Sequence, residues 1–235
     1  MKKNNSLAVI TARGGSKRIP RKNIKAFLGA PIIKYSIESA LVSGCFDEVM
    51  VSTDDKEIAD IAQRYGARVP FFRSQATSDD YATTSAVLEE VILQYRGDGQ
   101  AFEYFCCIYP TAPLLSPQKL REGFELLKKR NADSVLAVAR YSYPIQRALK
   151  IENGKVSMIA PENSIKRSQD LPPAYYDAGQ FYWFKTEAFL NSERPFFSNT
   201  MALEIPAAEV QDIDTNEDWE IAEIKYNLLR MMRRI

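Results

Sequence analysis

Hydrophobic residues in this chain gather in short runs that alternate with longer amphipathic stretches. The runs have the length of buried strands and lie at 7–12, 48–52, 102–109, 132–139, 180–184 and 203–206, with a further extended segment at 67–72. The stretches between them predict helices at 31–44, 53–66, 85–95, 119–129 and 215–234. Because strands and helices alternate through short connections, the sequence predicts an α/β fold with a mostly parallel, Rossmann-like sheet and helices on both faces.

The alternation fails between residues 140 and 176. Two short β-like pieces, 148–151 and 155–159, flank Asn153 and Gly154, which form a strong signal for a hairpin turn. These pieces carry too little apolar content to form a core of their own. The sequence therefore predicts one main domain made of 1–139 and 177–235, with 140–176 inserted as a small arm that needs another surface.

Composition narrows the class of protein. The 235 residues fit one α/β domain with a modest insertion, and a net charge of +1 argues against bulk affinity for nucleic acid. No apolar run approaches the length of a membrane span, and no signal peptide precedes the first strand. Cys45, Cys106 and Cys107 lack metal or redox spacing, which is typical of buried thiols in a reducing compartment. We therefore expect a cytoplasmic protein that binds neither nucleic acid nor a membrane.

A glycine-rich loop crowded with cations follows the first strand. Gly14 and Gly15 are expected to take positive φ and turn their N–H groups inward as an anion-binding nest. The cations around this turn are Arg13, Lys17, Arg18, Arg21, Lys22 and Lys25. A buried strand that opens into such a loop suits a polyphosphate at the carboxyl end of an α/β sheet. The alternative is a surface basic patch, which rarely follows a buried strand directly. The spacing fits neither a P-loop nor GxGxxG.

A pair of carboxylates precedes the last predicted helix. On an extended strand, Asp212 and Asp214 would share one face, roughly 6–7 Å apart along the backbone, while Ile213 enters the core. Two oxygens placed in this way can hold one Mg²⁺ together with phosphate oxygens and water. Alternatively, Asp214 or Thr215 caps the helix, because Thr215 and Asp218 resemble a capping box. The chain has no histidine, which excludes Ser-His and Cys-His catalysis and an imidazole base.

The aromatic segment 175–183 mixes core and candidate site residues. Phe181 and Trp183 are expected on one buried face of a strand. Asp177 and Gln180 are polar residues that enter the same strand, so they need partners.

The N-terminal stretch resembles the signature of the sugar-acid cytidylyltransferases, the CMP-sialic acid synthetase family. Their pattern, Ala-Arg-x-x-Ser-Lys-x-x-x-x-Lys-Asn, is filled here by Ala12, Arg13, Ser16, Lys17, Lys22 and Asn23. The family also carries an Asp-x-Asp before its C-terminal helix. The strings 144–149, 167–170 and 177–183 look like the pseudaminic acid branch of this family, and the resemblance covers essentially the full chain. The chain departs from the usual pattern at Tyr109, where most members have Gln.

The resemblance implies transfer of CMP from CTP to the anomeric hydroxyl of a nine-carbon sugar acid, with release of pyrophosphate. Pseudaminic acid is the expected acceptor, and legionaminic, N-acetylneuraminic or a shorter keto-deoxy acid is the alternative. A homologue that binds CTP without turnover is a further alternative of a different class. In the resembling family the inserted region packs on a second subunit and lends residues to its site. A homodimer is therefore expected, joined through the arm 140–176.

Site residues follow from the same resemblance together with the patterns above. Mg²⁺ is expected on Asp212 and Asp214, and the expected catalytic residues are Arg13, Lys22 and Asp212. Either Asp212 or a metal-activated hydroxyl serves as the base. The expected nucleotide contacts are Arg13, Gly14, Gly15, Ser16, Lys22, Asn23, Arg73 and Tyr109. The expected sugar-acid contacts are Gln146, Arg147, Arg167, Tyr176, Asp177 and Gln180. Arg147 and Arg167 are candidates for the carboxylate, because a guanidinium matches it bidentately, or they are surface charges.

Overall fold

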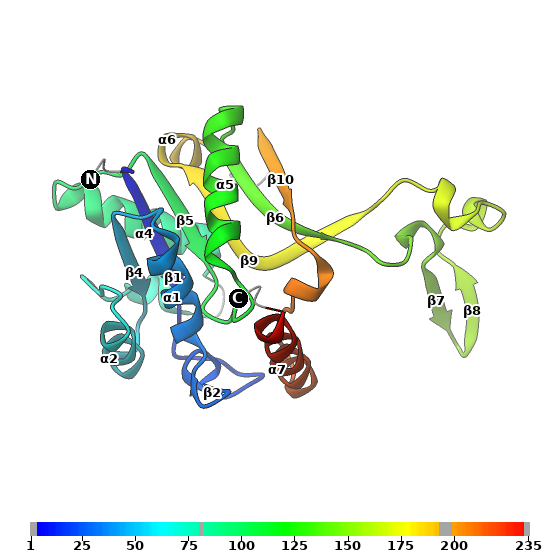
Figure 1. The fold of residues 1–235 in the computed structure, drawn as a ribbon, viewed down its shortest axis with the longest axis horizontal. Coiled ribbons are helices and arrows are strands. Elements are labelled where there is room, and N and C mark those ends of the chain that lie inside the picture. Colours follow the sequence, from blue (N-terminus) through cyan, green and yellow to red (C-terminus); the bar gives the residue numbers. More distant parts are fainter. Residues whose placement is uncertain (1–3, 80–81, 193–198, 233–235) are drawn as a thin grey trace.

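The computed structural model describes residues 4–79, 82–192 and 199–232. Within these residues, six strands form a central sheet in the order β10-β6-β9-β5-β1-β4 (Figure 1). The strands are β1 (Ser6–Thr11), β4 (Glu48–Ser52), β5 (Tyr104–Ile108), β6 (Ser134–Arg140), β9 (Tyr175–Lys185) and β10 (Thr200–Glu204). Neighbours pair in parallel except β9, which lies antiparallel between β5 and β6. The mostly parallel α/β sheet is therefore confirmed.

Helices cover both faces of this sheet. They are α1 (Ile33–Ser43), α2 (Lys56–Arg64), α3 (Gln75–Ser78), α4 (Thr84–Gly97), α5 (Pro117–Arg130), α6 (Thr186–Leu190) and α7 (Asn216–Met231). Side chains alternate between the faces of a strand, so Ala8 and Ile10 of β1 pack with α1, α2 and α5. Leu7 and Val9 pack with α4 and α6 on the other face. The sheet is thus buried between two helical layers.

A third apolar cluster joins the N-terminal loop to the last helix. Ile19, Phe27 and Ile32 pack there with Ile213 and Trp219 of the C-terminal segment. Phe27 lies in β2 (Ala26–Phe27), which pairs with β3 (Ala30–Pro31) after the short 3₁₀ turn η1 (Lys22–Ile24). This cluster brings residues about 190 positions apart together and fixes the C-terminal acidic segment beside the cationic loop.

Most predicted bounds differ from the observed ones by a few residues, and two of the differences have a clear physical reason. The first helix begins at Ile33 rather than Pro31, because Pro31 belongs to β3. Segment 67–72 is not a strand of the sheet. Arg68 alone bridges to β4, and Pro70, which has no N–H group, follows two residues later and prevents the ladder from continuing.

The inserted arm projects from the body of the protein (Figure 1). Its end carries the two-stranded sheet of β7 (Leu149–Glu152) and β8 (Lys155–Met158), flanked by the 3₁₀ turns η2 (Ile145–Arg147), η3 (Pro161–Asn163) and η4 (Ser168–Asp170). Asn153 and Gly154 both have positive φ, which confirms the predicted hairpin turn. A last 3₁₀ turn, η5 (Ala207–Glu209), precedes the acidic segment. None of the helices in the described part of the chain combines the length and apolarity that a membrane span requires.

Candidate active site

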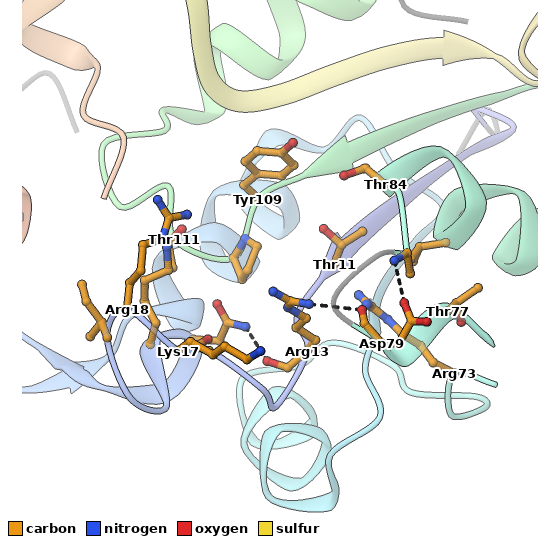
Figure 2. A pocket seen from close by; sticks show the side chains of 17 residues that line it. Thr11, Arg13, Lys17, Arg18, Arg73, Thr77, Asp79, Thr84, Tyr109 and Thr111 are labelled. Carbon is orange, nitrogen blue, oxygen red and sulfur yellow. Dashed lines mark hydrogen bonds between the residues drawn. The ribbon is translucent and has the colours of Figure 1, made fainter. Parts of the chain in front are cut away.

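A cavity of about 400 Å³ opens at the carboxyl ends of β1 and β5 (Figure 2). The chain leaves β1 toward β4 on one side and later returns to β5 on the other, so β1 is the topological switch point of the sheet. Open α/β sheets bind their ligands at this kind of position. The cavity is lined by Thr11, Arg13, Ser16, Lys17, Arg18, Ile19, Lys22, Asn23, Arg73, Thr77, Asp79, Ala82, Thr84, Val87, Tyr109, Pro110 and Thr111.

The structure brings the predicted nucleotide contacts together around this cavity. Six of them line it, namely Arg13, Ser16, Lys22, Asn23, Arg73 and Tyr109. A further wall of the cavity comes from α3 and the start of α4, which the sequence patterns did not reveal, and includes Thr77, Asp79 and Thr84 (Figure 2). The only signal for this wall in the sequence is the polar stretch 73–84 before the third predicted helix. No periodic pattern reveals that two short segments line the same cavity.

The glycine pair does not have the predicted conformation. Neither Gly14 nor Gly15 has a positive φ, so the expected nest of inward amides does not form in this way. The Gly14 N–H instead donates to Asp54 Oδ1 at 2.8 Å, while a Cβ at Gly14 would lie 2.8 Å from Asp55 Oδ2. Glycine is required here by the close approach of the Asp55 carboxylate, and the left-handed residue of the loop is Arg21 (φ 54°).

The cations of the cavity are held by neighbouring polar groups. Asn23 is buried, and its Nδ2 donates to the Arg13 carbonyl at 2.8 Å. Arg13 Nη1 donates to the Asp79 carbonyl at 3.2 Å, as Figure 2 shows. Arg73 donates from Nε to Ser52 Oγ at 2.8 Å and from Nη2 to the Ser52 carbonyl at 2.9 Å. Burial lowers the pKa of Arg73 to about 10, so it stays cationic at neutral pH. These bonds fix positive charge in place before a ligand arrives.

Lys22 connects the cavity to the predicted acidic pair. Its Nζ donates to the Ile213 carbonyl at 2.6 Å and lies 3.6 Å from Asp214 Oδ1. Arg18 lies 2.5 Å from the other oxygen of Asp214. Ile213 is fully buried, as predicted, although the segment around it is not a β-strand. Arg18 and Lys22, which line the cavity, therefore contact the C-terminal acidic segment, although Asp212 and Asp214 do not line the cavity themselves.

The alternative role of Asp214 as a helix cap is not observed. Thr215 caps α7, and its side chain and that of Asp218 form a reciprocal capping box. The Asp214 carboxylate is left to pair with Arg18 and Lys22. Partial burial and then the Asp214 charge raise the pKa of Asp212, while the Lys22 charge opposes this.

The acidic pair fits a divalent cation only together with other ligands. Among the described residues, no three acidic or thiol side chains cluster closely enough to hold a metal by themselves. Mg²⁺ is usually held by one or two carboxylates plus substrate phosphates. Asp212 and Asp214 offer two such carboxylates, and a bound cation would offset the burial and the Asp214 charge that raise the pKa of Asp212.

Residues of β9 form the floor behind the acidic pair. A Cβ at Gly179 would lie 3.8 Å from Asp212 Cγ, so Asp212 packs directly on this strand. Gln180 is 2% exposed, and its Nε2 donates to the Glu209 carbonyl at 2.6 Å. It supports the segment that leads to Asp212 and is not exposed to a sugar acid. Asp177 is exposed and accepts bonds from the Gly179 N–H at 2.8 Å and from the Tyr182 hydroxyl at 2.9 Å.

Comparison with known proteins decides the family. Residues 7–216 match the model of a family described as cytidylyltransferase. The chain belongs to the cytidylyltransferase family. A protein of Campylobacter jejuni named pseudaminic acid cytidylyltransferase is 45% identical over 95% of this chain and 97% of its own length. The CMP-N,N'-diacetyllegionaminic acid synthase of Legionella pneumophila is 32% identical over 92% of this chain and 94% of its own.

A solved structure shares the fold of this cytidylyltransferase at low sequence identity. A CMP:2-keto-3-deoxy-manno-octonic acid synthetase in complex with CTP matches with a TM-score of 0.70 and 16% identity. The match covers 96% of this chain and 99% of that one. The predicted family, fold class and enzyme class are thereby confirmed.

Three predicted sugar-acid contacts of the cytidylyltransferase lie in the projecting arm, away from the cavity of their own chain (Figure 1). Gln146 Nε2 donates to the Pro172 carbonyl at 2.9 Å, and Arg147 Nη1 donates to Ser168 Oγ at 3.3 Å. Arg167 pairs with Asp170 at 2.8 Å. Within one subunit the structure does not bring these three side chains to the nucleotide site.

Tyr176 lies at the root of the arm of this cytidylyltransferase, where β9 begins. Its ring packs against Tyr141, with 4.9 Å between the ring centroids. It is half-buried and does not line the cavity. Tyr176 therefore stays a candidate contact at the border between the arm and the body.

Proposed function

We propose that this cytidylyltransferase transfers CMP from CTP to the anomeric hydroxyl of pseudaminic acid and releases pyrophosphate. The likeness over nearly the full chain to the Campylobacter jejuni protein, at 45% identity, carries the choice of sugar acid. The cavity supports the choice of donor, because it combines cations for a triphosphate with a polar wall from α3 and α4. Legionaminic acid is the second candidate acceptor, supported by the 32% identity to the Legionella protein.

Catalysis would come mainly from positioning and from preorganised charge. Arg13 and Lys22 would balance negative charge on the α-phosphate and on the leaving pyrophosphate. Their positions are set before CTP binds, Arg13 through Asn23 and Lys22 through the Ile213 carbonyl. Cations that need no reorganisation stabilise the charge that develops during transfer more than mobile surface cations do.

We further propose that Asp212 and Asp214 hold Mg²⁺ when CTP is bound. The ion would supply charge neutralisation to the phosphate oxygens. Asp212 would also accept the proton of the sugar hydroxyl, a role favoured by the burial that raises its pKa.

The arm supports a homodimer in which each subunit completes the site of the other. Leu149, Ile151 and Val156 of the arm hairpin are each at least 60% exposed, and an isolated two-stranded hairpin is marginally stable. Arg147 and Arg167 lie at η2 and η4 of the arm and do not line the cavity of their own chain. A second copy of the chain would cover the apolar hairpin and receive these guanidinium groups.

Complementation tests the dimer. A subunit carrying Lys22→Ala has a defective loop and an intact arm, while a subunit carrying Arg147→Ala has the reverse. If the arm acts across the interface, the mixed dimer contains one complete site and regains activity that both parent variants lack. A mixed dimer that is no more active than its parents, or an active monomer by light scattering, would contradict this arrangement.

A cytoplasmic location also stays a proposal. Cys45, Cys106 and Cys107 are buried free thiols, which agrees with a reducing compartment. Fractionation of the native host with an antibody to the protein tests it.

Pyrophosphate release tests the reaction itself. With CTP, Mg²⁺ and pseudaminic acid, we expect release that stops when the sugar acid is omitted or when EDTA is added. Binding of CTP without any release, with each sugar acid in turn, would assign the protein to the non-catalytic CTP binders.

A further inference from the structure

One carboxylate outside the cavity contacts both ends of the cationic loop. Asp55 caps α2, because its Oδ1 accepts a bond from the Ile58 N–H at 3.0 Å. The same side chain accepts two bonds from the Arg21 guanidinium, one from Nη1 and one from Nη2 at 3.0 Å. It also packs on Gly14 so closely that a Cβ there would lie 2.8 Å from Oδ2. Asp55 thus joins the beginning of the loop, at Gly14, to its end, at Arg21.

Arg21 has an unusual backbone conformation next to this contact. Its φ of 54° and ψ of 31° are left-handed, a conformation that residues with a side chain rarely adopt. Its Nη2 also donates to Glu57 Oε2 at 2.6 Å, so the guanidinium is held by two residues around the start of α2. The next residue is Lys22, which begins η1. The conformation of Arg21 therefore sets the direction in which Lys22 enters the site.

We propose that Asp55 is a positioning residue for CMP transfer, which holds Arg21 and Gly14 in place and thereby directs Lys22 at the α-phosphate. Asp55 and Arg21 do not line the cavity, so their effect is transmitted through the loop. This inference rests on the proposed function, since it assigns Lys22 to the phosphates of CTP. We call the ion pair between Arg21 and Asp55 the clamp. Its hydrogen bond from Arg21 lowers the pKa of Asp55, as expected for a carboxylate held by a guanidinium.

The substitution Asp55→Asn separates the two roles of this carboxylate. Asparagine caps a helix about as well as aspartate, so α2 keeps its N-cap. Its amide group offers one acceptor oxygen and cannot take a bidentate guanidinium. We expect kcat to fall at least about tenfold, with a smaller change in KM for CTP, because misplacing a reacting group by ~1 Å costs about 100-fold.

Two companion variants make the result specific. Arg21→Gln removes the other half of the clamp, and the double variant should be no slower than the slower single variant, because coupled residues are not additive. Glu57→Gln removes only the ion pair between Arg21 and Glu57, whose side chain is 67% exposed. The kcat of this variant should stay within about twofold of wild type.

Limited trypsin digestion gives a readout that needs no substrate. In wild type the loop is held at both ends, so we expect slow cleavage after Lys17 and Arg18 although Arg18 is 69% exposed. Asp55→Asn and Arg21→Gln should both accelerate cleavage there, while Glu57→Gln should not. Unchanged digestion together with kcat within about twofold of wild type, or additive effects in the double variant, would show that Asp55 is only a helix cap. If wild type fails to turn over CTP, the proposed function falls, while digestion still decides whether the clamp exists.

Discussion

Replacing Lys22 by methionine tests whether the loop and the acidic pair work as one site. Methionine keeps most of the aliphatic stem but removes the ammonium, which donates to the Ile213 carbonyl at 2.6 Å and lies 3.6 Å from Asp214. Removing one preorganised donor from a developing charge typically costs about 100- to 1,000-fold in kcat. We expect kcat/KM for CTP to fall by this factor.

The same substitution should change stability only modestly. A hydrogen bond to a charged group contributes about 1.5–3 kcal/mol, and water reaching this partly exposed side chain reduces that value toward about 1 kcal/mol. The acid side of the pH–rate profile should also move to higher pH. The Lys22 charge lowers the pKa of Asp212, so without it the pKa of Asp212 rises and the active carboxylate is lost at a higher pH.

Steady-state kinetics across pH, together with thermal unfolding, check these expectations. Lys25→Met is the matched control, because Lys25 lies on the same loop but contacts Asn216 at 3.4 Å and the Trp219 ring. It does not line the cavity and should lose a similar amount of stability with near-normal turnover. Equal kinetic losses in the two variants, or an acid limb that does not move in Lys22→Met, would refute the reasoning.

Three further substitutions address the loop and the acidic pair. Gly14→Ala should destabilise the protein by about 1–3 kcal/mol in denaturant unfolding, because the Asp55 carboxylate occupies the space of the new methyl group. Gly15→Ala is the control, because its methyl group meets open space, and equal losses of stability in the two variants would contradict this. Asp212→Asn should raise the Tm at neutral pH while abolishing turnover. The raised pKa of Asp212 means that its ionised form lowers the stability of the folded protein at neutral pH. The gain in Tm of the variant over wild type should therefore shrink as the pH falls through that pKa. A gain that grows at low pH would contradict this. Asp214→Asn should abolish turnover with the fold intact, and normal specific activity would remove Asp214 from the metal site.

Local patterns in the sequence were sufficient for the layers of the fold and for much of the cavity. The apolar runs predicted the strands because a buried strand must be apolar on both faces. The capping box at Thr215 and Asp218 was also readable, because it depends on two residues three positions apart. Arg13, Lys22 and Asn23 were found because they lie in one short segment after the first strand.

The remaining features depend on contacts between distant segments. The direction of β9 follows from the path of the arm, which no local pattern records. The glycine pair was misinterpreted because Gly14 contacts Asp54 and Asp55, about 40 residues away. Phe181 and Trp183 were correctly placed in the core, because the alternation of faces along a strand is a local pattern. Gln180 was assigned to the sugar, although its amide instead secures Glu209.

The central claim is the choice of pseudaminic acid, and side-by-side kinetics test it most directly. Pseudaminic, legionaminic and N-acetylneuraminic acids are compared at saturating CTP and Mg²⁺, with pyrophosphate release as the readout. A site that matches pseudaminic acid should leave at least one hydrogen-bonding group unpaired when N-acetylneuraminic acid binds. The loss of one hydrogen bond lowers kcat/KM by about tenfold. We predict that kcat/KM is highest for pseudaminic acid and at least about tenfold above that for N-acetylneuraminic acid. Equal or better use of N-acetylneuraminic acid would contradict the account.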